Sequence, residues 1–280
     1  MTAMEPIPTP VIQPIHLQIA DEIRMAIESG ALGPGAQLPT IRDLAERWRC
    51  SMGSVRAALD LLKAQGLIST GRGRPPVVRH SPVRAVRASS RHQAEKDAAL
   101  YSEAERAAAG ESEINLGLAI DQVNFAAEYS QVEAGELARV LQINESDSVL
   151  RRHYSHNTPD GLKLSDSISY IPLAIIDTNP KLLDADNEPW PGGTMHQLLT
   201  VGVEVVEIRD LVTARAPTTV EKHAWKMQEG IPLICCRRIS SDGYGRVVEI
   251  SDSAYPSDRT EFEFVTILSP WPKEKATLGQ

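Results

Sequence analysis

Cysteine is scarce in this sequence, with three residues among 280, and no two of them form a CxxC pair. Structural zinc sites and disulfide frameworks use several cysteines at defined spacings, so the sequence supports neither. Cys235 and Cys236 are adjacent within the apolar run 231–236, and Cys50 stands alone. We therefore expect reduced thiols, with the adjacent pair buried, and no metal site.

Long apolar segments are also missing, because no stretch approaches the roughly 18 residues that a membrane-spanning helix needs. The N-terminal residues MTAMEPIPTPVIQP lack the basic and apolar regions of a secretory signal. Hydrophobic residues make up 42% of the chain and charged residues 24%, which is typical of globular proteins. These features favour a cytoplasmic protein with room for two domains.

The chain has no overall excess of cationic residues, since its formal net charge is −8. The charge is unevenly divided, however. Residues 1–93 contain 12 Lys and Arg against 7 Asp and Glu, whereas residues 94–280 contain 17 against 30. A basic first segment and an acidic second segment indicate separate tasks, and contact with phosphates belongs to the first.

Two short helical patterns lie between residues 39 and 66, and both have capping signals. Thr40 precedes the first pattern, and Asp43 follows three residues later as in a capping box. Ser51 precedes the second pattern, and Gly66 stands where that helix should end. The spacing of apolar residues on each pattern predicts one buried and one exposed face.

The residues around these two helices predict a further helix before them and a hairpin after them. An earlier helical pattern begins at Ile15 and stops at Gly30. Strand-like residues 67–70 and 76–79 bracket the turn Gly71-Arg72-Gly73-Arg74. Three helices followed by a hairpin form a winged helix-turn-helix, which places its last helix in the DNA major groove. The sequence therefore predicts a DNA-binding domain over residues 15–79.

The residues expected to contact DNA lie on three parts of this domain. Arg42 is in the first turn of the second helix, where a side chain can reach the phosphate backbone. We expect the start of the third helix to contact phosphates and base edges. The full set is Arg42, Ser51, Met52, Gly53, Ser54, Arg56, Arg72, Gly73 and Arg74, the last three being at the hairpin tip.

The rest of the chain divides into segments of different composition. Residues 1–14 are proline-rich and predict a flexible arm, residues 80–112 lack an apolar period and predict a linker, and residues 273–280 form a tail. Residues 113–272 carry the second domain. Its expected strands are 149–156, 165–171, 204–214, 233–239 and 247–255, and its expected helices are 133–141, 194–200 and 219–227. Adjacent antiparallel strands with helices between them indicate the α+β fold class.

The segment 14–78 resembles the GntR family of bacterial transcription regulators. The resemblance is carried by LPTIRDLA, VRAAL and GLI, which occur here at the spacing of that family. It implies that Arg42, Ser51, Ser54, Arg56 and the Arg72-Gly73 wing tip touch DNA. This chain departs from the common pattern at Met52 and Gly53, where members often have polar or basic side chains.

The segment 113–271 is similar to the UTRA effector domain of the HutC-like branch of this family. The matching motifs are ISYIP at 168–172, GTMHQLL at 193–199, TARA at 213–216 and VVEISDSAYPSDRTEFEF at 247–264. The resemblance implies an antiparallel-sheet α/β domain of the chorismate-lyase type, which binds a small-molecule effector and forms a homodimer.

The expected ligand-binding residues are Arg152, Tyr154, His156, Ser169, Tyr170, Glu249 and Tyr255. Many relatives that sense anions carry an Arg-x-Arg pair where this chain has Tyr154 and His156. We therefore expect a ligand that is neutral, aromatic or singly charged, with Arg152 able to hold one acidic group. His153 and His156 lie on opposite faces of a strand, which argues against a metal site.

Three functions remain open at this point. The first is a dimeric repressor that binds double-stranded operator DNA and responds to a small molecule. The second is a constitutive repressor whose acidic domain only dimerises. The third is an enzyme of the chorismate-lyase type, but the sequence has no nucleophile–base set, phosphate loop or metal-ligand set. We expect no enzymatic activity and no cofactor.

Overall fold

The computed structural model describes residues 13–71, 74–80, 84–110 and 123–269, and the backbone alone for 107–110. The chain divides into two compact units. The first unit comprises residues 1–82 and 217–231, and the second comprises residues 83–216 and 232–280. Each unit has its own hydrophobic clusters. None of the described helices is long and apolar enough to cross a membrane.

The first unit contains three helices and a small hairpin. The helices are α1 (Ile15–Glu28), α2 (Ile41–Arg47) and α3 (Met52–Ala64), and the antiparallel strands are β1 (Ile68–Ser69) and β2 (Val77–Val78). The predicted caps are confirmed. The Thr40 side chain accepts a hydrogen bond from Asp43 N, and the Asp43 carboxylate accepts one from Thr40 N. The left-handed φ of +79° at Gly30 and +71° at Gly66 follows the ends of α1 and α3.

One apolar cluster holds these elements together. Ile19 and Ile23 of α1 pack with Leu44 of α2 and with Val55 and Leu62 of α3. Burial of such side chains stabilises a fold by about 1.5–3 kcal/mol each relative to exposure. Because the apolar face of α3 packs against this cluster, the opposite face of the helix remains in solvent. The segment 217–231, which contains α9 (Thr219–Ala224), also belongs to this unit, and Glu229 forms an ion pair with Lys63 at 2.9 Å.

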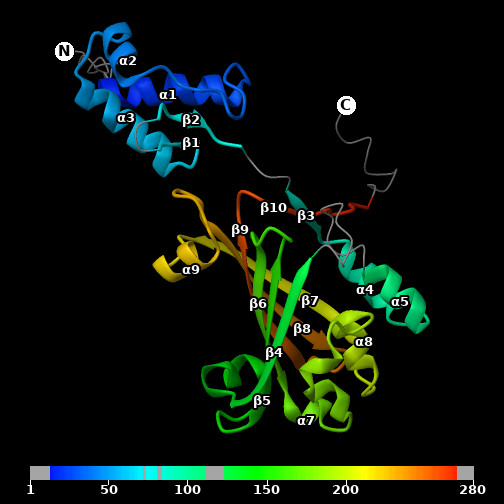
Figure 1. Ribbon diagram of the computed structural model, residues 1–280. Coiled ribbons are helices and arrows are strands. Elements are labelled where there is room, and N and C mark those ends of the chain that lie inside the picture. The colour runs from blue at the N-terminus through cyan, green and yellow to red at the C-terminus, as the bar shows by residue number, and fades with distance from the viewer. Residues whose placement is uncertain (1–12, 72–73, 81–83, 111–122, 270–280) are drawn as a thin grey trace, which may run out of the picture. The chain divides into compact units, whose positions relative to one another are not determined.

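The second unit is built on a six-stranded antiparallel sheet with the order β4-β5-β6-β9-β8-β7 (Figure 1). The strands are β4 (Asn124–Glu133), β5 (Ser148–Asn157), β6 (Lys163–Pro172), β7 (Val205–Arg215), β8 (Leu233–Asp242) and β9 (Val247–Pro256). The five predicted strands are confirmed, and the sheet gains β4, which the sequence had not predicted. A separate parallel pair joins β3 (Ala85–Ala88) to β10 (Thr260–Glu263).

Helices lie on both sides of the six-stranded sheet. On one side, Ile176 of α7 (Leu173–Ile176) and Leu198 of α8 (Gly193–Leu199) pack against Leu150 of β5. On the other side, Leu141 of α6 (Ala138–Leu141) packs against Val149. Neighbouring residues of β5 thus enter different clusters, as expected for a strand whose side chains alternate between faces. Short 3-10 turns occur at Gly135–Leu137, Pro180–Leu183 and Ala185–Asn187.

The stretch interpreted from the sequence as a linker contains regular structure. Besides β3, residues 80–112 include α4 (Arg91–Ala98) and α5 (Glu103–Gly110), and the segment from Val83 onward belongs to the second unit. None of the α4 side chains is fully buried, which explains why no apolar period marks this helix. Outside the described residues lie positions 1–12 of the arm predicted at 1–14, the wing residues Arg72 and Gly73, and the tail at 273–280.

Candidate functional site

The exposed face of α3 is the first candidate site. Ser51, Met52, Gly53 and Arg56 are all exposed at or near the start of this helix. Ser51 Oγ accepts a hydrogen bond from Ser54 N at 3.1 Å, which fixes the first turn. A helix N-terminus carries a partial positive charge from its free N–H groups, so this end of α3 favours contact with phosphate.

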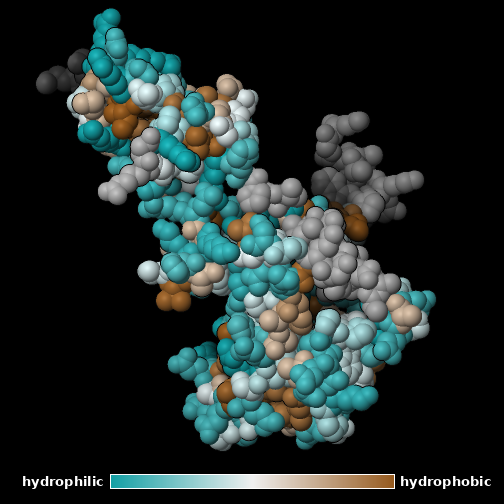
Figure 2. All heavy atoms as spheres, viewed as in Figure 1, coloured by the Kyte–Doolittle hydropathy of each residue, from teal (hydrophilic) through white to brown (hydrophobic). Residues whose placement is uncertain are grey.

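Other parts of the first unit also carry exposed arginines. Arg42 is exposed in the first turn of α2, and Arg74 is exposed beside the hairpin. Arg49, in the turn between α2 and α3, is exposed and has a φ of +48°. A left-handed conformation costs a residue other than glycine about 1–2 kcal/mol. Figure 2 shows the mainly hydrophilic surface of this unit, with apolar residues in small patches.

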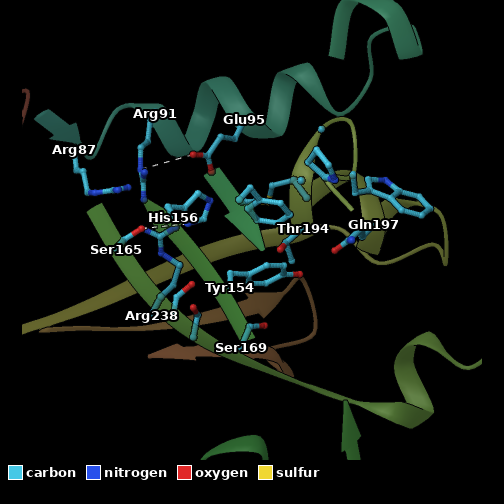
Figure 3. Close-up of a pocket in the computed structure, with 18 of the residues that line it drawn as sticks. Arg87, Arg91, Glu95, Tyr154, His156, Ser165, Ser169, Thr194, Gln197 and Arg238 are labelled. Atoms are coloured by element: carbon cyan, nitrogen blue, oxygen red, sulfur yellow. Dashed lines mark hydrogen bonds and ion pairs between the residues drawn. The ribbon is translucent and has the colours of Figure 1, made fainter. Parts of the chain in front are cut away.

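A cavity of about 1270 Å³ in the second unit is the other candidate site (Figure 3). Its walls come from β5, β6, β8 and β9 of the sheet, from α8, and from β3 and α4 of the expected linker. In Figure 3, Arg91 and Glu95 extend from α4 toward the strands that carry His156 and Ser165. The cavity is large enough for a metabolite-sized ligand.

A buried arginine lies beneath the cavity. Arg152 on β5 is 1% exposed, and its guanidinium donates to Glu249 Oε1 at 2.6 Å and to Ser169 Oγ at 2.8 Å. It also donates to Gln197 Oε1 and to Thr194 Oγ1. Burial alone lowers the pKa of a guanidinium, but the neighbouring acidic groups raise the pKa of Arg152 above its ordinary value. Arg152 is therefore positively charged, and its ion pair with Glu249 compensates that charge.

Two phenols and a carboxylate form a second polar cluster at the cavity. Tyr154 Oη donates to Glu188 Oε1 at 2.9 Å, Tyr129 Oη donates to the same oxygen, and Gln197 Nε2 donates to it at 3.0 Å. Burial raises the pKa of Tyr129 to about 12, so this phenol stays protonated at neutral pH. The cluster fixes the ring of Tyr154, which lines the cavity as an aromatic wall.

His156 and Ser165 form a third group near β3. The His156 ring packs 5.1 Å from the Phe125 ring, and its Nδ1 lies 3.3 Å from Ser165 Oγ. Burial, with help from Arg87 and Lys163, lowers the pKa of His156 to about 4. The imidazole is therefore neutral at pH 7. Arg87 on β3 lines the same part of the cavity, with its guanidinium 4.4 Å from the centre of the Tyr255 ring.

Ion pairs hold α4 against the sheet. Arg238 donates to Asp210 at 2.9 Å and its guanidinium lies 3.0 Å from His92 Nε2, and Lys96 pairs with Glu204 at 2.6 Å. Burial tends to raise the pKa of Asp210, but hydrogen bonds from His92 and Arg238 hold that pKa well below its ordinary value. The wall formed by α4 is therefore attached mainly by charge, in contrast to the apolar packing of α8.

The cavity brings together most of the ligand-binding residues that the sequence predicted. Tyr154, His156, Ser169, Glu249 and Tyr255 line it. Arg152 lies below the lining, tied to Glu249 and Ser169. Tyr170 does not line the cavity, because it follows Ser169 on β6 and packs against the cluster on the other sheet face. That assignment overlooked the strand alternation that separates neighbouring residues.

Several lining residues were not predicted from the sequence. Arg87, Arg91 and Glu95 come from the expected linker, Phe125 comes from β4, and Trp190 comes from the loop before α8. Gly193, Thr194, Met195 and Gln197 also line the cavity, and they had a signal because they lie in the GTMHQLL motif. Among the described residues, no group of three His, Cys, Asp or Glu side chains could hold a metal ion.

Two family models match the chain, and they divide it as the structure does except at residues 217–231, which the UTRA match includes and the structure assigns to the first unit. Residues 15–78 match the model described as bacterial regulatory proteins of the gntR family. Residues 126–261 match the UTRA domain. The first match covers α1, α2, α3 and the hairpin, and the second covers the six-stranded sheet with the lining residues of β5, β6, β8 and β9.

Relatives and solved structures agree with these matches. An HTH-type transcriptional regulator of Streptomyces coelicolor is 24% identical over 253 residues, covering 88% of this chain and 90% of the relative. A regulator of the same type from Rhizobium meliloti is 24% identical over 256 residues, covering 89% and 93%. The crystal structure of a GntR-family transcriptional regulator has a TM-score of 0.68 at 24% identity, covering 92% of this chain and 99% of the other, which shows a common fold.

Proposed function

Because the chain belongs to the GntR family of transcriptional regulators and carries a UTRA domain, we propose that it is a homodimeric, cytoplasmic repressor with an effector-controlled affinity for DNA. The observation that carries this proposal is the presence of two distinct sites in two units. One is the exposed basic face at the start of α3, and the other is the cavity over the sheet. The relatives are transcription regulators, and the protein is not an enzyme.

The first unit supplies the operator contacts. Arg42 and Arg74 are placed to bind phosphates, while the exposed start of α3, with Ser51, Met52 and Arg56, is placed to read base edges. Phosphate contacts give most of the affinity and base contacts give the sequence preference. Two copies of the domain on a dimer bind two half-sites separated by about one helical turn.

The cavity favours an effector with an aromatic or apolar body and one acidic group. Of the two carboxylates at its floor, Glu188 accepts hydrogen bonds from tyrosines and Glu249 is paired with Arg152, so neither adds an uncompensated negative charge that would favour a ligand cation. The phenyl and phenol rings of Phe125 and Tyr154 stack 5.9 Å apart and offer an apolar surface. Arg87 provides positive charge at the β3 end, where the neutral His156 adds a hydrogen-bonding group.

A ligand in the cavity can control DNA binding because two walls of the cavity are next to the DNA-binding unit in the chain. β3 and α4 line the cavity, and they follow directly in the chain after the DNA-binding unit. A ligand that binds one arrangement of these walls better than another shifts the equilibrium between arrangements by its difference in affinity. In a dimer, such a shift changes the spacing of the two reading helices. A constitutive repressor whose second unit only dimerises is the alternative.

Fluorescence anisotropy with DNA from upstream of the protein's own gene tests this proposal. The purified full chain is titrated with and without a panel of aromatic and aliphatic monocarboxylates, each paired with its amide. We expect specific binding that an acid relieves and its amide does not. Arg42→Ala and Arg56→Ala should each weaken binding by about 1–3 kcal/mol, whereas Arg139→Ala, an exposed arginine of the second unit, should not.

The possible results separate the alternatives. Specific binding that no compound changes supports the constitutive repressor and removes effector control. Binding by Arg42→Ala and Arg56→Ala with wild-type affinity means that α2 and α3 do not contact DNA as proposed. If an amide acts as well as its acid, the acidic group is not recognised and the arginine at the β3 end has no part in binding.

A further inference from the structure

The first turn of α3 presents one large apolar side chain to solvent. Met52 is 51% exposed and is not part of the hydrophobic cluster beneath α3. It is the first residue of the helix, directly after the N-cap Ser51. This turn of a winged helix-turn-helix enters the major groove, where the apolar group on the base edges is the 5-methyl group of thymine.

We infer that Met52 reads the 5-methyl group of a thymine and sets the base preference at one position of each operator half-site. The inference rests on the operator binding proposed above. A methionine side chain is flexible and polarisable, so it can follow the surface of a methyl group closely. It cannot replace the hydrogen bonds that polar residues make to guanine or adenine edges.

The polar side chains beside Met52 are engaged with each other. Ser51 Oγ accepts from Ser54 N at 3.1 Å, and the two hydroxyl oxygens lie 3.0 Å apart. Gly53 contributes no side chain, and a Cβ at that position would meet only Ser51 Oγ, at 3.5 Å. Glycine in a helix costs about 1 kcal/mol relative to alanine, but here it lets the backbone approach the groove. Met52 is therefore the side chain of this turn best placed to reach a base.

Arg56 gives this inference a positional consequence. It is exposed four residues after Met52, so the two side chains are neighbours on the helix surface. Arginine forms two hydrogen bonds to O6 and N7 of guanine. Four residues span about 6 Å of helix, against about 3.4 Å for each base-pair step. We therefore expect the recognised thymine to lie within about two base pairs of a guanine contacted by Arg56.

The experiment removes the methyl group from the DNA without changing its sequence. A randomised duplex library is first enriched with the full-length protein. Each thymine of the enriched duplex is then replaced, one at a time, by deoxyuridine, which lacks only the 5-methyl group. At one thymine in each half-site we expect Kd to rise about fourfold, the effect of losing one buried methyl group. Other thymines should be insensitive.

Protein variants then identify the residue that senses the methyl group. Met52→Ala should bind the thymine and deoxyuridine duplexes equally. Met25→Ala is the matched control, because Met25 is 62% exposed on α1 of the same unit, and it should keep the fourfold difference. Met52→Arg, enriched again from the library, should select guanine in place of the thymine. Unchanged denaturant unfolding confirms that each variant is folded.

Two results would overturn the inference while leaving operator binding intact. One is that deoxyuridine has no effect at any position in the wild-type protein. The other is that it has the same effect on wild type and Met52→Ala, which would assign the methyl contact to a different residue. If the library yields no enriched duplex, the proposed operator binding itself fails.

Discussion

His156 is a half-buried titratable side chain whose charge state affects the stability of the second unit. Burial lowers its pKa to about 4, against an ordinary value of 6.5. Arg87 and Lys163 lower it further, while Asp166 and Glu188 oppose them. In the unfolded chain the imidazole takes up a proton below about pH 6.5, but in the folded protein it does so only near pH 4. Unfolding between these values therefore binds a proton, and acid favours the unfolded state.

The stabilisation linked to His156 is complete above pH 6.5 and is lost progressively as the pH falls toward 4. We expect the wild-type free energy of unfolding to drop by about 2 kcal/mol more than that of His156→Gln between pH 7.5 and pH 5. Urea unfolding of both proteins at the two pH values measures this difference. Equal pH dependence of the two proteins would show that the folded imidazole titrates near its ordinary pKa.

At the scale of elements, one ion pair connects three neighbouring strands. Arg152 of β5 donates to Glu249 of β9 at 2.6 Å, and Ser169 of β6 lies between them with bonds to both. The two charged side chains are 2% and 8% exposed. Removing one partner of a buried pair leaves an uncompensated charge, which is more destabilising than removing both.

Glu249→Leu should therefore lower the free energy of unfolding by about 3–5 kcal/mol, and Arg152→Met should do so similarly. The double variant Arg152→Met, Glu249→Leu should recover much of that loss, since an apolar pair leaves no buried charge. Chemical denaturation of the four proteins gives the coupling energy. Losses that simply add would mean that the two residues act independently. Glu249 substitutions alone are consequently poor probes of ligand contact.

The sequence predicted those elements whose apolar residues recur at the spacing of a strand or a helix. β5, β6, β8 and β9 are rich in alternating or apolar residues, and the sequence predicted them. β4 is an edge strand without a fully buried residue, and its alternation of half-buried and exposed residues stops at Ser130, so its apolar pattern is weak. α4 has no buried residue and is held by ion pairs such as Lys96 with Glu204. Tertiary contacts alone define both elements.

The two candidate sites also differ in how far the sequence predicted them. The residues proposed to contact DNA lie close together in the chain, so family motifs and the cap Ser51 predicted which of them lie at the start of α3. The cavity collects residues from β3 to β9, and its arginines from the expected linker could be assigned only once the parallel pairing of β3 with β10 was known. Parallel pairing between such distant segments leaves no local mark on the sequence.

Across the full chain, positive and negative charge are separated between two segments. Residues 1–93 are net basic and attract DNA, whereas residues 94–280 are net acidic and repel it. Dissolved salt screens both interactions. Counterion release at each neutralised phosphate makes log K fall with log salt, with a slope of about −0.9 for each phosphate contact on B-form DNA. The slope thus counts the cationic contacts of the whole assembly.

This dependence provides a count of the chains bound to one operator. Arg42→Ala removes one proposed phosphate contact per chain, so the salt slope should become shallower by about 0.9 for a monomer and about 1.8 for a dimer. Arg139→Ala changes the net charge equally but lies on α6 of the acidic unit, so it should leave the slope unchanged. Anisotropy titrations of wild type and both variants across a range of salt concentrations give the slopes. A change near 0.9 would contradict the homodimer, and no change would remove Arg42 from the phosphate contacts.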